Sequence, residues 1–391
     1  MKPRRQSHEK AIAFFEPRCT GIVHLDSAAS IIDMFGKIFP EHRLVFYTEE
    51  THGYFTKHQT STKFEQININ IPKSPKNRME WLKEVFWDFA MMLKIGKTKP
   101  EYIICMSNTW QIVLFAKLFQ RNQKIVFFFH SIEKEINQKV PAYKPVRWFW
   151  RSMEWNIKAH IQVVFGESIL REIAKIRPKL KFKSLDLPRL PCYDDTAPIN
   201  IAASPPVKFS VLGGGITGDV SMIFLLEQKL GKMPECFELH FKGAADCEGR
   251  LAGLKIPDGS KIKLRSKPEM LSPEELDDYI NMMDFCVFLY PSNYYLFTAS
   301  GALLEAFAHL KPVVALHNPY FDYVFNKMVG GGGDVGYLCD TVDEMAYVIK
   351  EIVLTGDIER YNAQRKNIMN GMRLFSTSHL AGDMKSILSD L

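Results

Sequence analysis

The chain has 391 residues, of which 46% are hydrophobic and 24% are charged, and its formal net charge at pH 7 is +6. This length exceeds what one hydrophobic core usually organises, and the composition excludes a disordered chain, so we expect two globular domains. The 7 cysteines form no CxxC pair and no metal-ligand spacing with histidine, which favours reduced packing residues and no metal site. The first residues show no secretory-signal pattern and no apolar run is long enough to span a membrane, so a cytoplasmic location is expected.

Strand-like and helix-like runs alternate through the first half of the chain. The predicted strands are Ala11–Phe15, Leu44–Tyr47, Ile67–Ile71, Tyr102–Met106, Ile125–Phe129 and Val163–Phe165. The predicted helices are a run capped by Asp26 or Ser27, Met79–Leu93, Trp110–Phe119 and a run ending at Ile176, whereas Thr51–Lys63 is polar with no clear period. This rhythm is typical of a mostly parallel sheet covered by helices on both faces.

Proline-rich sequence then interrupts the pattern, which predicts an interdomain linker over 191–206. The rhythm resumes afterwards. The predicted strands are Val207–Leu212, Phe237–Phe241 and Lys261–Leu264, with a helix over Val220–Leu230. Capping boxes at Ser272–Glu275 and Thr341–Glu344 predict the starts of two further helices.

The stretch Phe285–Leu316 carries the strongest functional signal. An apolar run ending at Tyr290 predicts a strand, Phe297–Phe307 predicts a helix with small residues at its mouth, and Lys311–Leu316 predicts the next strand. A helix N-terminus with closely spaced Ser, Gly and Ala leaves backbone N–H groups free to face an anion, and the helix dipole adds to the attraction. The stretch therefore predicts a phosphate site, the alternative being an ordinary crossover whose small residues only permit close packing.

This arrangement resembles the GT-B glycosyltransferases, and especially the retaining enzymes of glycosyltransferase family 4. The resemblance covers most of the chain and is strongest from Met283 to Val353. It is carried by Leu303-Leu304-Glu305-Ala306, by Lys311-Pro312-Val313-Val314, by the turn-like Gly336-Tyr337-Leu338, by Asp343-Glu344-Met345-Ala346, and by the strand ends Phe128-Phe129-His130-Ser131 and Phe165-Gly166-Glu167-Ser168.

The resemblance implies an α/β fold of two Rossmann-like domains (GT-B type) that face each other across a cleft. The expected division is an acceptor-side domain at 1–190, the linker at 191–206 and a nucleotide-sugar-binding domain at 207–370. A C-terminal helix within 371–391 is expected to pack back on the N-terminal domain.

The resemblance also implies a set of nucleotide-binding residues in the second half. Glu305 is expected to accept hydrogen bonds from the ribose hydroxyls, the alternative being a surface glutamate paired with a lysine. The remaining candidates are expected to contact the diphosphate, with helix capping or plain solvation as the alternatives: Gly214, Lys242 after the second strand, Thr298, Ser300 and Gly301.

In the first half, His130 is expected to bind a sugar hydroxyl or to stabilise charge at the reacting centre, together with Lys242. Its alternative is a structural hydrogen bonder. Gly21 and His24 are expected to approach the acceptor, with an ordinary turn as the alternative.

The sequence departs from the family pattern at its paired glutamates. The family places them eight positions apart, and Phe297 stands eight positions before Glu305. The family's Arg and Lys after the first strand of the second half are also missing, because the loop reads Gly213–Asp219 without a cation. Contacts to the donor sugar must therefore differ from the usual set, and retention of the anomeric configuration rests on the resemblance alone.

Cations and tryptophans are interleaved in the segment Lys139–Lys158. A helix with this composition suits the surface of an anionic membrane on its cytoplasmic side, and Arg147, Trp148, Arg151 and Trp155 are the candidate contacts. The alternative is a helix whose aromatic residues face the sheet while its cations face water. Nucleic-acid binding is not favoured, because no recognised motif accompanies these residues.

These observations predict a glycosyltransferase that moves a sugar from a UDP- or GDP-type donor to a glycan or a lipid-linked acceptor, with a place in surface polysaccharide synthesis. The nucleotide-sugar is a substrate, and no cofactor is expected. Two alternatives stay open: a nucleotide-sugar epimerase on the same architecture, and a non-catalytic protein of the same fold that only binds.

Overall fold

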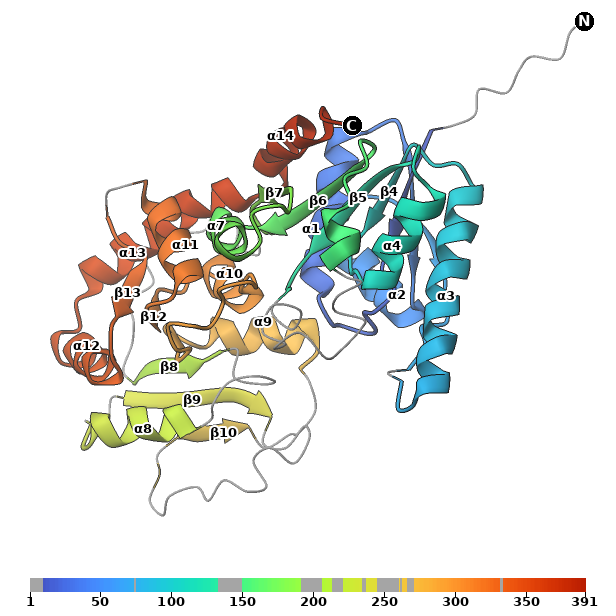
Figure 1. Ribbon diagram of the computed structural model, residues 1–391. Coiled ribbons are helices and arrows are strands. Elements are labelled where there is room, and N and C mark those ends of the chain that lie inside the picture. The colour runs from blue at the N-terminus through green and yellow to red at the C-terminus, as the bar shows by residue number, and fades with distance from the viewer. Residues whose placement is uncertain are drawn as a thin grey trace, which may run out of the picture. The chain divides into compact units, whose positions relative to one another are not determined.

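The computed structural model describes residues 10–73, 75–132, 150–190, 206–212, 221–233, 237–244, 260, 262–265, 271–330 and 333–391. The chain divides into two compact units (Figure 1). The first unit comprises Met1–Leu190, Phe297–Ala299 and Phe375–Leu391, and the second comprises Pro191–Leu296 and Ser300–Leu374.

The first unit is built on a seven-stranded parallel sheet with the order β3-β2-β1-β4-β5-β6-β7. Its strands are β1 (Ala11–Phe15), β2 (Arg43–Thr48), β3 (Glu65–Asn68), β4 (Tyr102–Cys105), β5 (Lys124–Phe129), β6 (His160–Phe165) and β7 (Phe182–Leu185). The strands predicted from the sequence are present, although the third begins and ends earlier than Ile67–Ile71. The seventh strand, β7, was not predicted.

Helices of the first unit pack in two groups. They are α1 (Leu25–Ile38), α2 (Glu50–Gln59), α3 (Arg78–Lys97), α4 (Trp110–Phe119), α7 (Glu167–Ile176) and α14 (Thr377–Leu388). α1 packs against α2 and α14, and α3 packs against α4. Because the strand order reverses direction after β3, right-handed crossovers place α1 and α2 on one face of the sheet and α3 and α4 on the other.

Two predictions for the first unit are wrong. α1 begins at Leu25, its N-cap His24 has a left-handed backbone with φ 53°, and no side chain caps it. Asp26 instead lies in the first turn and pairs with Arg189 at 3.0 Å, because a tight turn over residues 20–25 leads straight into the helix. The second error is α2, which lies in the segment that showed no clear period. Its buried residues are His52, Gly53 and Thr56, so no apolar stripe marks it.

The second unit is built on a six-stranded parallel sheet with the order β10-β9-β8-β11-β12-β13. Its strands are β8 (Val207–Val211), β9 (Phe237–Ala244), β10 (Lys263–Arg265), β11 (Phe285–Phe288), β12 (Val313–Leu316) and β13 (Gly336–Cys339). Its helices are α8 (Ser221–Leu230), α9 (Pro273–Asn281), α10 (Gly301–Ala308), α11 (Pro319–Val329), α12 (Val342–Thr355) and α13 (Ile358–Met372). α8 packs against α12, while α13 packs against α10 and α11.

The capping boxes can be compared with the structure directly. The box that starts α9 is complete, since Ser272 accepts from the Glu275 amide and the Glu275 carboxylate accepts from the Ser272 amide. At α12 only half of the predicted box forms, because the Glu344 carboxylate accepts from Asp340 rather than from Thr341. The turn that the resemblance predicted at Gly336-Tyr337-Leu338 is wrong, because these residues belong to the strand β13.

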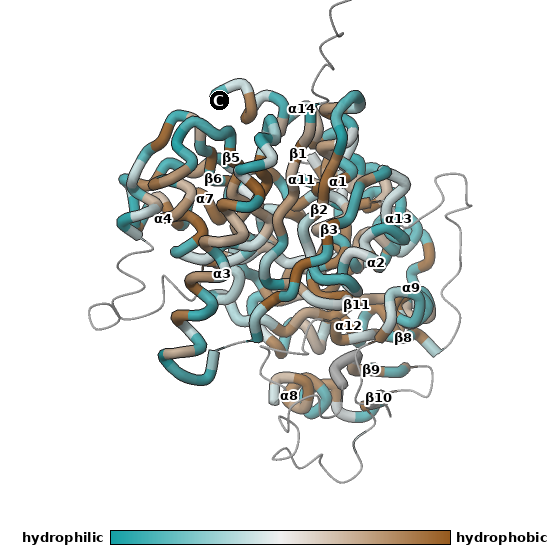
Figure 2. Tube along the Cα trace, turned by 90° about the vertical axis from the view of Figure 1, so that its right-hand side faces the viewer, coloured by the Kyte–Doolittle hydropathy of each residue, from teal (hydrophilic) through white to brown (hydrophobic). Residues whose placement is uncertain are grey.

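Hydrophobic side chains gather along both sheets. The tube around β5 and β6 is largely brown in Figure 2, and every residue of β6 is buried. The second unit has its own core, in which Phe209, Val287 and Val314 from neighbouring strands meet the apolar faces of α8 and α12. The cysteines of the described chain, Cys19, Cys105, Cys286 and Cys339, are buried, and no disulfide joins them. No described helix is long and apolar enough to cross a membrane.

Candidate functional site

Each sheet has one place where neighbouring strands connect in opposite directions. In the first unit it lies between β1 and β4, and in the second between β8 and β11. Open α/β sheets bind ligands just outside the carboxyl ends of the strands at such points. The candidate residues can therefore be judged by their distance from these two places.

In the second unit, the N-terminus of α10 follows β11 after the loop 289–300, of which Phe297–Ala299 belong to the first unit. Ser300 is fully buried and caps the helix, because its Oγ accepts from the amide of Leu303 at 3.2 Å. The structure therefore shows Ser300 as a helix cap, which was the alternative to a contact with the diphosphate. The amides of Gly301 and Ala302 have no acceptor inside the helix, as for any first turn, and Gly301 is exposed. The helix mouth therefore keeps N–H groups that can meet an anion.

Three tyrosines fix the loop that leads to α10. Tyr290 stacks on Tyr294 with ring centroids 4.7 Å apart and meets Tyr295 edge-on at 4.9 Å. Tyr295 itself has a left-handed backbone with φ 57°. Burial, followed by the neighbouring Tyr295, raises the pKa of Tyr290 above its usual value, so this phenol stays protonated. These rings hold the start of the loop and were not singled out in the sequence.

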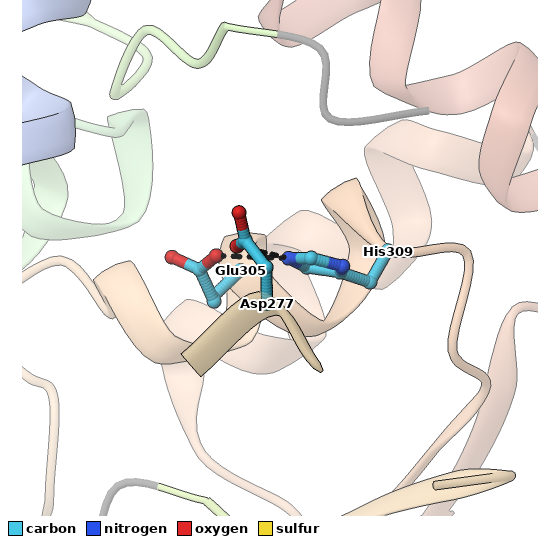
Figure 3. A group of neighbouring side chains, drawn as sticks. All are labelled: Asp277, Glu305 and His309. Carbon is cyan, nitrogen blue, oxygen red and sulfur yellow. Dashed lines mark ion pairs between the residues drawn. The ribbon is translucent and has the colours of Figure 1, made fainter. Parts of the chain in front are cut away.

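Glu305 lies in the second turn of α10 and is 8% exposed. It is not the surface glutamate paired with a lysine that the simpler alternative required. Its Oε1 lies 3.3 Å from Nε2 of His309, one turn later, and the same nitrogen lies 3.2 Å from Oδ1 of Asp277 on α9. Figure 3 shows the imidazole directed toward both carboxylates. Asp277 and His309 were missed, because nothing in the sequence indicates that α9 and α10 meet here.

The other candidates of the second half fall in different places. Thr298 belongs to the first unit, where its Oγ1 lies 2.6 Å from Oγ of Ser131 and the two residues form an antiparallel bridge. Lys242 lies inside β9 rather than after it, because the strand continues to Ala244. Gly214 lies outside the described residues.

In the first unit, a buried glutamate organises the carboxyl ends of β1 and β4. Glu16 is 2% exposed and accepts hydrogen bonds from the amides of Arg18 and Cys19 and from Oγ of Ser107. It therefore ties the loop after β1 to the loop after β4 at the reversal point. Glu16 was not predicted as a functional residue, because a Glu-Pro pair after an apolar run is typical of a simple strand end.

Gly21, His24 and His130 come together at this edge. The rings of His24 and His130 lie 5.1 Å apart. Nδ1 of His52 lies 2.8 Å from the carbonyl of Gly21, so this nitrogen carries the hydrogen. Desolvation by the surrounding protein, and then the neighbouring His24, lower the pKa of the half-buried His130 to about 3. Desolvation is also the first cause that lowers the pKa of His24, although its side chain is exposed. Both rings are neutral near pH 7, which suits hydrogen bonding better than charge stabilisation.

The described part of the tryptophan-rich segment packs on the protein. Residues 150–154 are helical, and Trp150 is 4% exposed. The guanidinium carbon of Arg177 lies over the Trp150 ring, 4.8 Å from the ring centroid. Trp155 packs against Arg121 at 4.9 Å, whereas Arg151 is exposed. Aromatic residues that face the protein and a cation that faces water match the simpler alternative. Arg147 and Trp148 lie outside the described residues.

No protein-family model matches the chain, and no curated protein is significantly similar to it in sequence. Solved structures match it over nearly its whole length. One is a glycosyltransferase from Rickettsia africae, at 14% identity and a TM-score of 0.65, covering 98% of both chains. Another is HepE from Anabaena, solved with UDP and glucose, at 14% identity and a TM-score of 0.64, covering 98% of this chain and 100% of that one. A third is WaaG, a glycosyltransferase of lipopolysaccharide biosynthesis, at 13% identity and a TM-score of 0.61, covering 97% and 99%.

These likenesses define the class of fold. The chain has two Rossmann-like halves arranged along the sequence as in the GT-B glycosyltransferases, as the sequence predicted. At such identities they show the fold alone.

Proposed function

We propose that the protein is a glycosyltransferase that uses a nucleotide diphosphate sugar, of the UDP or GDP type, as its donor. The observation that carries the proposal is the buried carboxylate of Glu305, one helical turn behind the open N-terminus of α10 and beyond the reversal-point strand β11. A carboxylate on a rigid helix suits the two ribose hydroxyls, and the free amides at the helix mouth suit the diphosphate. HepE, which shares this fold, was solved with UDP and glucose.

The remaining residues are assigned by unit. In the second unit, Gly301 and Ser300 shape the diphosphate site, and Gly214 and Lys242 contribute to it. In the first unit, Gly21, His24 and His130 bind the acceptor or the transferred sugar through uncharged hydrogen bonds, with Thr298 beside them. Catalysis then rests on positioning and on stabilising the departing diphosphate.

The acceptor is a glycan or a lipid-linked saccharide, in surface polysaccharide synthesis on the cytoplasmic side of a membrane. Arg147, Trp148 and the exposed Arg151 are the proposed membrane contacts, whereas Trp155 is left out because it packs against Arg121. Transfer is also proposed to retain the anomeric configuration of the sugar, as in family 4, although Phe297 stands where the family has one of its glutamates.

Calorimetric titration with UDP, GDP and ADP tests the nucleotide site. One of them is expected to bind the wild type, and Glu305→Gln is expected to weaken that binding by at least about tenfold, because an amide accepts the ribose hydrogen bonds poorly. Glu359→Gln, which changes an exposed glutamate on α13, is the matched control and should bind like the wild type.

Two outcomes would contradict the proposal. If no nucleotide binds the wild type, the protein has no donor site of this kind. If Glu305→Gln binds as tightly as the wild type, the ribose assignment is wrong. A nucleotide-sugar epimerase is distinguished by product analysis, because a transferase releases the nucleoside diphosphate only when an acceptor is supplied.

A further inference from the structure

The cluster of Asp277, Glu305 and His309 has a geometry that a hydrogen-bonded ion pair does not explain. The His309 side chain is only 2% exposed, and its Nε2 lies 3.2 Å and 3.3 Å from one oxygen of each carboxylate. Nevertheless, among the described residues no group forms a hydrogen bond with this nitrogen. Both oxygens therefore lie near Nε2 but away from the direction in which an N–H would point.

This is the placement that ligands take around a shared cation. Zinc binds imidazole nitrogen and carboxylate oxygen at about 2.0–2.2 Å, so two ligand atoms at the corners of a tetrahedron lie roughly 3.3–3.5 Å apart. The distances from Nε2 to the carboxylate oxygens of Asp277 and Glu305 are close to this expected separation. The three ligand atoms all lie within 4.8 Å of one another. The carboxylate oxygens of Asp277 and Glu305 would then lie on either side of the imidazole lone-pair axis, along which a metal ion would bind.

The second nitrogen of His309 is held as in metal-binding histidines. Its Nδ1 lies 3.2 Å from Oδ1 of Asn281, at the end of α9, and the backbone carbonyl of Asn281 accepts from Nζ of Lys311 at 3.0 Å. In the neutral ring, an Nδ1–H donated to an oxygen fixes the tautomer with the lone pair on Nε2, facing the carboxylates. A lone pair facing two carboxylates is unfavourable unless a cation stands between them.

We propose that Asp277, Glu305 and His309 form a binding site for a divalent transition metal of the zinc type. They are three protein ligands from two helices, and a fourth position is left for water or a ligand. Asp277 is half exposed at 49%, which gives a metal a way in from solvent. The site shares Glu305 with the proposed ribose site, but metal binding is measured without nucleotide, so the two proposals can fail separately.

The test is metal binding by the whole purified protein without nucleotide. Co²⁺ is the spectroscopic probe, because a tetrahedral site with nitrogen and oxygen ligands gives a visible absorption band. Zn²⁺ is expected to displace it and to raise the apparent Tm by at least about 3 °C. His309→Phe and Asp277→Asn are expected to lose the band and the Zn²⁺ shift, while circular dichroism without metal confirms that they fold.

His317→Gln is the matched control. His317 lies in the same unit with Nδ1 2.6 Å from Oδ1 of Asp322, but its side chain is 43% exposed. It should bind Co²⁺ like the wild type. If the wild type shows no Co²⁺ band and no Zn²⁺ shift, or if His309→Phe retains both, the proposal is wrong and the cluster is an ion pair only. Because UDP plays no part in these measurements, their failure leaves the nucleotide titration unaffected.

Discussion

The surroundings of Gly301 bear on whether the start of α10 is a ligand site or only a place of close packing. It begins α10, and a Cβ built on it would meet no heavy atom within 4 Å. Close packing therefore does not require a glycine here, which removes the alternative explanation for this small residue. The open space leaves room for the proposed diphosphate to reach the first turn of the helix.

Gly301→Ala is expected to leave the fold intact and even to stabilise it slightly, by up to about 1 kcal/mol, because alanine is the better helix former. The added methyl group is expected to weaken nucleotide binding by about tenfold or more, since it stands where the diphosphate approaches the amides. Urea unfolding measures the first effect and calorimetry the second.

Gly382→Ala is the control for this prediction. Gly382 is an exposed glycine of α14 with equally open space around its Cα, and its replacement should affect neither measurement beyond the gain in helix propensity. Unchanged nucleotide affinity in Gly301→Ala would move the diphosphate away from this helix mouth.

At the scale of elements, β13 depends on a glycine for a different reason. Gly336 has φ 150°, and a Cβ on it would lie 2.1 Å from the carbonyl oxygen of Val313 and 2.6 Å from its nitrogen. These are atoms of the neighbouring strand β12, to which Gly336 is paired, and backbone in a sheet has no room to move aside.

Gly336→Ala is therefore expected to destabilise the second unit by about 3 kcal/mol or more. Gly356→Ala provides the comparison, because Gly356 also has a positive φ of 56° but faces open space at the end of α12. It should cost only about 1 kcal/mol. Urea denaturation of the two variants ranks them, and equal midpoints would show that the contact with Val313 is relieved at little cost.

The elements also show what the sequence can and cannot predict. The strand runs were found because their apolar residues are contiguous, and α9 was found because Ser272 and Glu275 mark its start. α2 was missed because it buries His52 and Thr56 instead of an apolar stripe. Glu305 could be chosen from its motif, whereas its neighbours Asp277 and His309 depend on the packing of α9 against α10, which no local pattern encodes.

Across the whole molecule, the last helix of the chain, α14, packs against the first helix, α1, within the first unit. Thr377, at the start of α14, donates to Oδ2 of Asp33 on α1 at 2.6 Å, and Lys37 donates to both Asp33 and Thr377. Asp33 also accepts from Thr62 at 2.7 Å. Burial alone would raise the pKa of Asp33, but these hydrogen bonds outweigh it and hold the pKa below its usual value.

Thr377→Val keeps the shape of the side chain and removes its hydroxyl. Because Asp33 stays buried with one donor fewer, the loss of stability is expected to be about 1–3 kcal/mol at pH 7. Thr355→Val is the control, since this exposed threonine at the end of α12 donates to the carbonyl of Glu351 in its own helix, and it should cost less than about 0.5 kcal/mol.

The pH dependence of this difference identifies its source. A carboxyl whose pKa is lower in the folded state stabilises the fold above its unfolded pKa, 3.8 for Asp33, and loses that contribution as the pH falls through the lower folded value. The difference between wild type and Thr377→Val should therefore be constant from pH 7 to about 5 and shrink below pH 4. A difference that grows in acid would assign the effect to another group.

The meeting of α1 and α14 also sets an order of events during synthesis. α1 leaves the ribosome long before α14 exists, because the whole second unit is encoded between them. At about 5–20 residues per second, the face of α1 that α14 covers waits for roughly 20 to 70 seconds. During that time the carboxylate of Asp33 lacks its donor Thr377, and the face of α1 that α14 covers stays open to solvent.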